Sequence, residues 1–255
     1  MIDVHSHVLP GLDDGAKNDL DLIAMARAAV KDGITRVIAT PHHANGSYDN
    51  EAGVVLDAVE RANALLQQES IPLRLGAGQE VRLYRELVED YHEGKLLTLA
   101  GSKYLLLEFP SGRVPSGADE MVHELAVIGI TPIIAHPERN MELAGNPERL
   151  RQLIELGALT QVTTHSLLGV FGKKIASLSV DWCKQQLVHV IASDAHDPSY
   201  RCFGLQGAYE MIEARVSREI AEYCRLNAER IWLNEPIEAL VPVLARKPWY
   251  LRWKS

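Results

Sequence analysis

Short apolar runs alternate with segments of helical periodicity along nearly the whole chain. Seven of these runs have the length of β-strands: 2–8, 34–40, 73–80, 104–109, 130–136, 159–163 and 188–193. Strands that alternate with helices of about 10–15 residues indicate βαβ units and a parallel sheet. Seven strands in a chain of 255 residues favour a closed or nearly closed barrel over an open sheet. We therefore expect an α/β fold of the TIM-like barrel type.

Capping residues and prolines bound several of the predicted helices. The clearest helices run over 19–32 before Gly33, from Ser116 to Gly129, and from Asn146–Pro147 to Gly157. The stretch from about Gly204 to Asn234 is helical in pattern and is expected to cover one side of the barrel. No linker, composition shift or repeat divides the chain, so residues 1–255 are interpreted as a single domain. A basic and aromatic tail at about 245–255 is expected to pack on the barrel or to be disordered, with docking on an anionic membrane surface or a partner as the alternative.

Composition excludes several classes of function. The net charge of −8 provides no basic field for nucleic acid, and GxGxxG and GxxxxGK[ST] motifs are absent, which disfavours nucleotide binding. The three cysteines are widely spaced and form no disulfide or metal-binding pattern, which is typical of a reducing compartment. There is neither a secretory signal at the start nor an apolar run of about 18 residues. We therefore expect a cytoplasmic protein without an integral membrane segment.

Polar residues follow almost every predicted strand. On the first strand, His5 and His7 lie two residues apart and therefore point to the same face. Later strands end in His42-His43, Glu80, Glu108, His136 and Asp194-Ala195-His196. In a barrel of parallel strands these ends share one rim, where such folds carry their active sites. A single histidine at a strand end is more often a hydrogen-bonded structural residue, so the prediction depends on the whole set.

The whole set predicts a metal centre. Three buried carboxylates (Glu80, Glu108 and Asp194) beside several imidazoles would be costly without compensating cations. Imidazole and carboxylate ligands suit Mn²⁺, Fe²⁺ or Zn²⁺, and about nine ligands fit two or three ions better than one. Ions in such a site activate a bridging hydroxide for in-line attack at phosphorus. Arg139 and Arg201 are the candidate catalytic residues that hold the phosphate, although a surface salt bridge is the alternative for each.

Together these motifs resemble the polymerase and histidinol phosphatase (PHP) superfamily. The resemblance depends on DVHSHVLPGLDDG, TPHHANGSY, GAGQEV, LLLEFP, TPIIAHPERN and HVIASDAHDPSYR, and it covers nearly the whole chain. Within that superfamily the chain is similar to the bacterial manganese-dependent protein-tyrosine phosphatases of capsule and exopolysaccharide operons. The resemblance implies a distorted (β/α)₇ barrel with Mn²⁺ ions on its rim.

The resemblance also implies which residues hold each ion. The ligands would be His5, His7 and Asp194 for the first ion, with Glu80 bridging to the second; Glu108 and His136 for the second; and His42, His196 and Asp14 for the third. Asp13 is the alternative to Asp14, and His43 is the neighbour of His42 whose role is left unassigned. His165 is interpreted as a satisfied strand end or as a residue that orients a ligand or the substrate. Arg139 and Arg201 match the positions that grip the substrate phosphate.

The implied substrate is phosphotyrosine on the tail of a bacterial tyrosine kinase that controls polysaccharide export. Tyrosinate is a good leaving group because the pKa of tyrosine is about 10, so no strong general acid and no phosphoenzyme are required. The alternatives are a small-molecule phosphatase of the histidinol-phosphate type, a non-catalytic metal-binding protein, and a proofreading exonuclease module. A cysteine-dependent phosphatase is disfavoured, because the C-x₅-R match of Cys224 and Arg230 lacks glycine and is helical in pattern.

Overall fold

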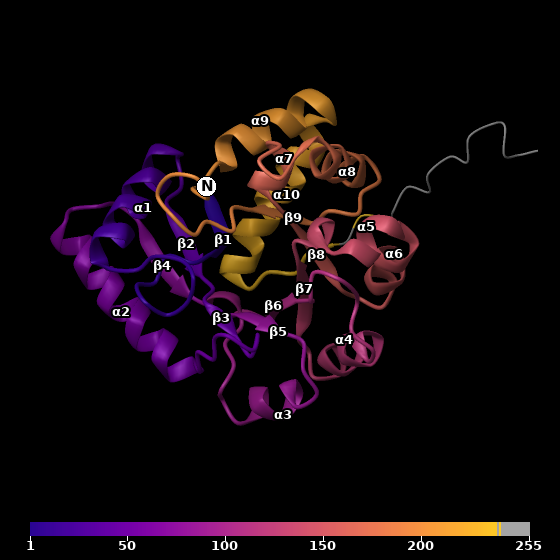
Figure 1. Ribbon diagram of the computed structural model, residues 1–255, viewed down its shortest axis with the longest axis horizontal. Coiled ribbons are helices and arrows are strands. Elements are labelled where there is room, and N and C mark those ends of the chain that lie inside the picture. Colours follow the sequence, from indigo (N-terminus) through magenta and orange to yellow (C-terminus); the bar gives the residue numbers. More distant parts are fainter. Residues whose placement is uncertain (239, 241–255) are drawn as a thin grey trace, which may run out of the picture.

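The computed structural model describes residues 1–238 and 240 of the 255. The predicted alternation of strands and helices is confirmed, with strands in the middle of the molecule and helices around them (Figure 1). The strands are β1 (Ile2–Ser6), β2 (Arg36–Ala39), β3 (His42–His43), β4 (Arg74–Ala77), β5 (Glu80–Arg82), β6 (Tyr104–Glu108), β7 (Thr131–Ala135), β8 (Leu159–Thr163) and β9 (Val190–Ala192). The basic and aromatic tail at 245–255 lies outside the described residues.

All strand pairs are parallel, and together they form a distorted (β/α)₇ barrel. One sheet has the order β1-β2-β4 and the other the order β3-β5-β6-β7-β8-β9. Chain continuity from β2 into β3 and from β4 into β5 joins the two sheets. The nine strands of the described residues therefore correspond to the seven predicted ones, with β3 and β5 continuing the runs at 34–40 and 73–80. A bridge between Ser6 and Ala195 brings β1 beside the segment that follows β9. The backbone N–H of His7 also donates to the carbonyl of Ala195 at 2.8 Å.

Two strands are broken in the middle, which the apolar pattern does not predict. Pro41 separates β2 from β3, and proline has no N–H to donate to a neighbouring strand. Gly78 lies between β4 and β5, where a Cβ would come within 2.9 Å of Ile38 and 3.0 Å of Leu99. Close packing therefore requires glycine at this bend.

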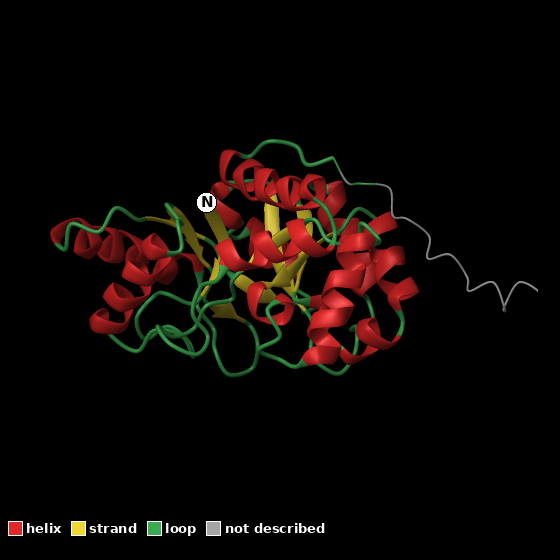
Figure 2. Ribbon diagram, turned by 90° about the horizontal axis from the view of Figure 1, so that it is seen from above, coloured by secondary structure: helices red, strands yellow, loops and turns green. Residues whose placement is uncertain are grey.

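The helices surround the barrel (Figures 1 and 2). They are α1 (Asp19–Lys31), α2 (Ala52–Gln68), α3 (Leu87–His92), α4 (Ala118–Val127), α5 (Met141–Gly145), α6 (Pro147–Glu155), α7 (Thr164–Leu167), α8 (Lys173–Lys184), α9 (Leu205–Arg215) and α10 (Arg218–Leu233), with 3₁₀ turns η1 (Leu99–Gly101) and η2 (Pro137–Arg139). The predicted helical stretch from Gly204 to Asn234 is confirmed as α9 and α10, and α10 packs against β1 and β9. No helix among the described residues is both long and apolar enough to cross a membrane.

Capping explains where the helices begin. The Asn18 side chain accepts from the backbone N–H groups of Leu20 and Asp21 and so starts α1. Ser116 is predicted to cap the helix that ends at Gly129. This prediction is wrong by one residue, because Gly117, at φ 88°, is the N-terminal cap of α4. A left-handed backbone at that position favours glycine. The predicted Pro147 at the first turn of α6 is confirmed, although Asn146 makes no side-chain capping bond.

Apolar side chains fill the barrel interior away from the site. Val4, Ile38, Leu106 and Ile133 belong to one buried cluster, together with Ile231 of α10. A second, larger cluster lies between the strands and the surrounding helices. The predicted metal ligands lie outside this apolar core, at the carboxyl ends of the strands.

Candidate metal centre

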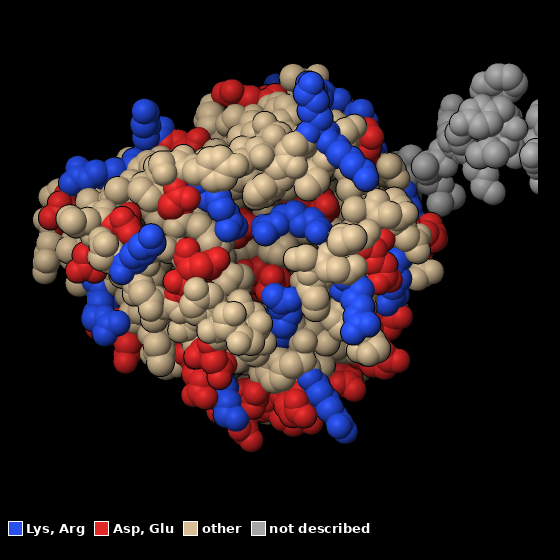
Figure 3. Space-filling view, viewed as in Figure 1, with Lys and Arg blue, Asp and Glu red and all other residues tan. Residues whose placement is uncertain are grey.

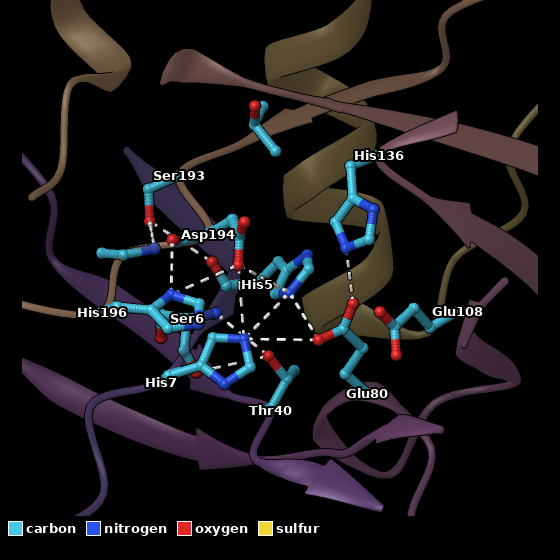
Figure 4. A network of polar contacts seen from close by, with 12 residues as sticks. His5, Ser6, His7, Thr40, Glu80, Glu108, His136, Ser193, Asp194 and His196 are labelled. Carbon is cyan, nitrogen blue, oxygen red and sulfur yellow. Dashed lines mark hydrogen bonds and ion pairs between the residues drawn. The ribbon is translucent and has the colours of Figure 1, made fainter. Parts of the chain in front are cut away.

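Nine predicted ligands lie together at the carboxyl ends of the strands, as Figure 4 shows for most of them. They are His5 and His7 at the end of β1, Asp14 in the β1–α1 loop, His42 on β3, Glu80 on β5, Glu108 on β6, His136 after β7, and Asp194 and His196 after β9. Residues as far apart in the chain as His5 and His196, 191 positions, thus meet in one cluster. Parallel strands explain this meeting, because their carboxyl ends share one rim.

Two imidazoles and two carboxylates converge at the middle of the cluster. The Nε2 atoms of His5 and His7 are 3.2 Å apart. Each of them lies 3.4 Å from Oε2 of Glu80 and 3.3–3.4 Å from Oδ1 of Asp194. All four residues are buried. Such a group of nitrogen and oxygen lone pairs, removed from water, is the environment that a divalent cation stabilises.

Neighbouring side chains fix the orientation of both imidazoles. Nδ1–H of His5 donates to Oε1 of Gln161 at 3.0 Å, and Nδ1–H of His7 donates to Oδ2 of Asp13 at 2.6 Å. With the proton on Nδ1, each ring presents the lone pair of Nε2 to the centre of the cluster. Gln161 and Asp13 therefore orient candidate ligands.

The adjacent residues Asp13 and Asp14 have different partners in the cluster. Asp13 is engaged with His7, whereas Oδ1 of Asp14 lies 3.5 Å from Nε2 of His42 and 3.3 Å from Nε2 of His196. The loop that carries both aspartates packs closely on β1 at Gly15, where a Cβ would overlap the backbone carbonyl of His7. The structure thus brings Asp14, rather than Asp13, to the third predicted position.

Three groups of candidate ligand atoms each lie within 4.8 Å of one another: His7, Asp14, His42 and His196; His5, His7 and Glu80; and His42, Glu80 and Glu108. The other two predicted ligands contact these groups. Nε2 of His136 lies 2.7 Å from Oε1 of Glu80, and Asp194 lies beside His5 and His7. Figure 4 shows Glu80 between the pair of histidines on β1 and the pair formed by Glu108 and His136.

Several buried atoms in this cluster make no hydrogen bond to the described residues. They are Nδ1 of His42, Oε2 of Glu80 and Oε2 of Glu108. Nδ1 of His42 and Oε2 of Glu80 are 2.9 Å apart, yet their geometry is not that of a hydrogen bond. A buried polar atom without a partner costs about 1–3 kcal/mol, and more when it is charged. Bound cations would satisfy these atoms, so the residues fit a metal centre.

The charges of the cluster shift its pKa values in different directions. Burial opposes ionisation of Glu80, but the charges of His5, His42 and His136 hold its pKa well below the usual value. Burial and the nearby charge of Glu80 raise the pKa of Glu108 to about 7. Burial and the charge of Arg139 lower the pKa of His136 to about 4. His136 is therefore neutral near pH 7, as a metal ligand must be.

Two arginines meet the cluster at a single carboxylate oxygen. Nη1 of Arg139 lies 2.6 Å from Oδ2 of Asp194, and Nη2 of Arg201 lies 2.7 Å from the same oxygen. The Nε atom of Arg201 is buried and makes no hydrogen bond to the described residues. The arrangement of guanidinium groups next to a candidate metal cluster suits a phosphoryl group, which needs cationic partners on several oxygens.

A family model described as "Capsular polysaccharide synthesis, CpsB/CapC" matches residues 1–232. This chain belongs to the CpsB/CapC family. It is 43% identical over 249 residues to the tyrosine-protein phosphatase YwqE of Bacillus subtilis, covering 97% of this chain and 98% of YwqE. It is 34% identical over 252 residues to the putative tyrosine-protein phosphatase CapC of Staphylococcus aureus, covering 98% and 99% of the two chains.

Solved structures give the same relationship. The chain superposes with a TM-score of 0.94 and 42% identity on a chain from the crystal structures of YwqE from B. subtilis and CpsB from Streptococcus pneumoniae, described as metal-dependent tyrosine phosphatases. That match covers 97% of this chain and 100% of the other. A β-aspartyl dipeptidase from Fervidobacterium islandicum AW-1 matches with a TM-score of 0.54 and 12% identity, which shows a shared fold alone. The recognition of the family from its motifs is thus confirmed, and so is the barrel.

Two histidines that the motifs left unassigned lie outside the three ligand groups of this CpsB/CapC chain. Nδ1–H of His43 donates to the carbonyl of Asn50 at 3.0 Å. Nδ1–H of His165, on α7, donates to the carbonyl of Ser193 at 2.9 Å. His165 therefore braces the backbone immediately before Asp194.

The C-x₅-R match lies within α10. Cys224 is buried, and burial raises the pKa of its thiol to about 12. A helix presents no loop of N–H groups to a phosphate, so Cys224 and Arg230 do not form a cysteine-dependent phosphatase site.

Sequence reasoning missed two residues beside the metal cluster. They are Gln161, which orients His5, and Arg82, whose Nη2 lies 3.0 Å from Oε2 of Glu108. It named Asp13 only as an alternative ligand to Asp14, and not as the residue that orients His7. Gln161 lies fully buried in the middle of β8, but Thr160 and Thr163 on the same strand are polar too, so its sequence position alone does not mark it. Arg82 lies two residues beyond Glu80 on β5, and this spacing places it on the same side of the strand.

Proposed function

We propose that this protein removes phosphate from phosphotyrosine on the tail of a bacterial tyrosine kinase that controls capsular or extracellular polysaccharide synthesis. It is a metal-dependent tyrosine phosphatase, as expected of a CpsB/CapC chain with the relatives described above. One observation carries the assignment: buried imidazoles and carboxylates, some without hydrogen-bond partners, gather beside two arginines. The whole chain acts as one domain in the cytoplasm.

The proposed metal ligands are those that the sequence predicts. His5, His7 and Asp194 would hold one ion, with Glu80 shared with a second that Glu108 and His136 complete; His42, His196 and Asp14 would hold a third. Mn²⁺ is the proposed ion, and Fe²⁺ or Zn²⁺ suits the same ligands. When bound, such ions lower the pKa of water to generate a nucleophile and neutralise charge on phosphate oxygens.

The arginines perform the steps that belong to the chain itself. Arg139 and Arg201 bind the phosphate oxygens and stabilise the charge that these oxygens carry as the ester bond breaks. Asp194 holds both guanidinium groups in place before substrate arrives. The leaving tyrosinate needs no strong acid because the pKa of tyrosine is about 10.

The position of the site supports a protein substrate. The Arg139 side chain is 31% exposed, the Asp14 side chain is 49% exposed, and both lie at the rim. Figure 3 shows a hollow near the middle of this face, with carboxylates inside it and Lys or Arg side chains around it. A phosphotyrosine on a flexible tail can reach such an open site.

Hydrolysis of a phosphotyrosyl peptide by the chelator-stripped protein, with Mn²⁺, Fe²⁺ or Zn²⁺ added back in turn, tests this proposal. Activity should vanish on stripping and return with metal. His136→Ala should stay inactive with every metal while retaining its circular dichroism spectrum. The matched control is His123→Ala, an exposed histidine on α4. Activity that survives both stripping and the His136 substitution would contradict the proposed mechanism, and faster turnover of histidinol phosphate than of the peptide would contradict the substrate.

A further inference from the structure

The flanks of the metal cluster differ in polarity. One cavity, of about 520 Å³, is lined by charged groups that include Asp14, Lys17, Asp21 and Asp197. The cavity near His43, of about 570 Å³, is also rich in charge, with Asp49, Glu51, Asp90 and Lys95 among its lining residues. The first of these cavities has no Phe, Tyr or Trp in its lining. The second is lined by Tyr48 and Tyr84 as well, but neither Arg139 nor Arg201 lines it.

The third flank is apolar and lies beside Arg139. The Arg139 guanidinium carbon is 5.1 Å from the centre of the Phe171 ring, which follows α7. Phe171 is half-buried, while its neighbours Leu168 and Val170 are 45% and 37% exposed. Tyr200, in the loop that leads to Arg201, is 69% exposed. We call Leu168, Val170, Phe171 and Tyr200 the apolar shelf.

Leu168 of the shelf lies beside Gly204, four residues after Tyr200 in the chain. A Cβ on Gly204, at the start of α9, would be 3.2 Å from Cδ1 of Leu168. In Figure 3 the surface over α7 and over the loop leading to α9 is largely uncharged and borders the basic side chains at the hollow. The shelf is therefore continuous with the proposed phosphate site.

The Phe171 ring contacts both His165 and Arg139. Its centre is 6.0 Å from that of His165, whose Nδ1–H donates to the carbonyl of Ser193. Arg139 is held against the ring on one side and by Asp194 on the other. A phosphate bound by Arg139 must therefore carry its ester substituent close to Phe171 or towards the charged cavities.

We infer that Phe171 and the apolar shelf bind the aromatic ring of the substrate, so that this site selects aryl phosphates over alkyl phosphates. This inference rests on the proposed phosphatase function. An aromatic ring packs favourably on Phe171 through offset or edge-to-face contact, whereas a small alkyl group has little surface to bury there. Phe171 is thus a specificity-determining residue for the ester substituent, next to the residue that grips the phosphate.

Competitive inhibition of the Mn²⁺-loaded enzyme by two phosphonates tests the inference. Phenylphosphonate carries a ring and methylphosphonate does not, and both present the same phosphonate group to Arg139 and Arg201. In Phe171→Ala the inhibition constant of phenylphosphonate should rise about five- to tenfold. That of methylphosphonate should change less than about twofold. Phe171→Tyr keeps an aromatic ring and should bind phenylphosphonate as tightly as the parent. The matched control is Tyr91→Ala, which removes a half-buried aromatic side chain on α3 and should change neither constant.

The outcomes separate three cases. A selective loss of phenylphosphonate binding supports the inference. An equal loss for both phosphonates would overturn it, because Phe171 would then act only by supporting Arg139; unchanged constants would overturn it as well. If Phe171→Ala fails to fold or to retain manganese, Phe171→Leu, which keeps an apolar side chain, is measured in its place and should show the same selective loss. A parent enzyme that neither hydrolyses phosphotyrosine nor binds either phosphonate would instead contradict the proposed function.

Discussion

At the scale of single residues, hydrogen bonds to Nδ1 of His5 and His7 determine how these two imidazoles direct Nε2 into the cluster. Asp13 and Gln161 accept from Nδ1–H of His7 and His5, and both acceptors are held in the folded chain. Asp13 also accepts from the backbone N–H groups of Gly15 and His42, so one carboxylate ties together three parts of the rim. Residues of this kind set metal affinity without binding metal themselves.

Asp13→Asn should therefore weaken manganese binding while the protein stays folded. The amide still accepts from His7, but a neutral acceptor supports the ligand less well than a carboxylate, and the affinity should fall about 10–100-fold. The manganese concentration for half-maximal phosphotyrosyl-peptide hydrolysis measures this change. Asp19→Asn, which removes an exposed acidic group in the first turn of α1, is the control and should leave that concentration unchanged. An identical manganese requirement in Asp13→Asn and the parent would contradict the orienting role.

The sequence located the candidate ligands but not the residues that support them. Glu80 and Asp194 could be predicted because they lie at the ends of apolar runs typical of strands, and His5 because it lies two residues from His7 on the first predicted strand. Asp13 could not be separated from Asp14, since adjacent residues in a loop carry no periodicity that assigns a direction. Gln161 acts across the barrel on a residue 156 positions away, a contact that exists only after closure.

At the scale of elements, the seven predicted strand positions are confirmed, and the interruptions within them are the difference. The apolar pattern predicts one strand at 34–40 and one at 73–80. In the structure each of these segments is interrupted before the candidate ligand that follows, His42 or Glu80. An apolar pattern predicts which residues are buried, but residues on both sides of these bends are buried. The pattern therefore does not predict where a strand is interrupted. The bends follow instead from Pro41 and from the close packing at Gly78.

Gly78→Ala should destabilise the barrel. The added methyl group would lie within 3.0 Å of Ile38 and Leu99, and overpacking of this kind costs about 1–3 kcal/mol. Urea unfolding of the manganese-loaded protein measures the change in unfolding free energy. The control is Gly112→Ala, where no atom lies within 4 Å of the added group, and its effect should stay within about 0.5 kcal/mol. Equal stabilities for the two variants would contradict the packing account of this bend.

The base of the β8–β9 pair contains a buried histidine that should make stability depend on pH. The backbone N–H of Thr160 donates to Nδ1 of His189, and burial lowers the pKa of His189 from 6.5 to about 4. Between those values the unfolded chain binds a proton that the folded protein does not, so stability falls as the pH decreases from about 6.5 to 4. The loss from this group amounts to about 3 kcal/mol.

His189→Asn tests this linkage, because the amide oxygen can accept from Thr160 but does not titrate. The variant should be less stable than the parent at pH 7.5, since the smaller side chain leaves a void. The gap should close by about 3 kcal/mol as the pH is lowered to 4. Unfolding free energies measured at both pH values decide the matter, and a constant gap would show that His189 does not titrate as described.

At the scale of the whole molecule, the chain carries a net charge of −8 yet presents arginines to its substrate. Arg82, Arg139 and Arg201 each pair with a carboxylate of the rim and remain partly exposed. Figure 3 shows how these charges are arranged, with basic side chains around a hollow that contains acidic ones. A local cationic border of this kind can attract a phosphorylated tail despite the overall negative charge.

The barrel fold brings the candidate ligands together. Side chains from β1, β3, β5 and β6, and from the segments after β7 and β9, form one anionic cluster only because the strands are parallel and close in a ring. Bound cations would stabilise such a cluster and would provide the chemistry of ester hydrolysis.

The need for bound cations is tested by the manganese-to-protein ratio after equilibration with Mn²⁺ and removal of loosely held ions. Mass-spectrometric metal analysis should find two or three ions in each chain. His136→Ala should hold fewer, while the His123→Ala control should hold as many as the parent. A parent protein that is fully active on phosphotyrosyl peptide and yet contains well under one ion per chain would contradict the account.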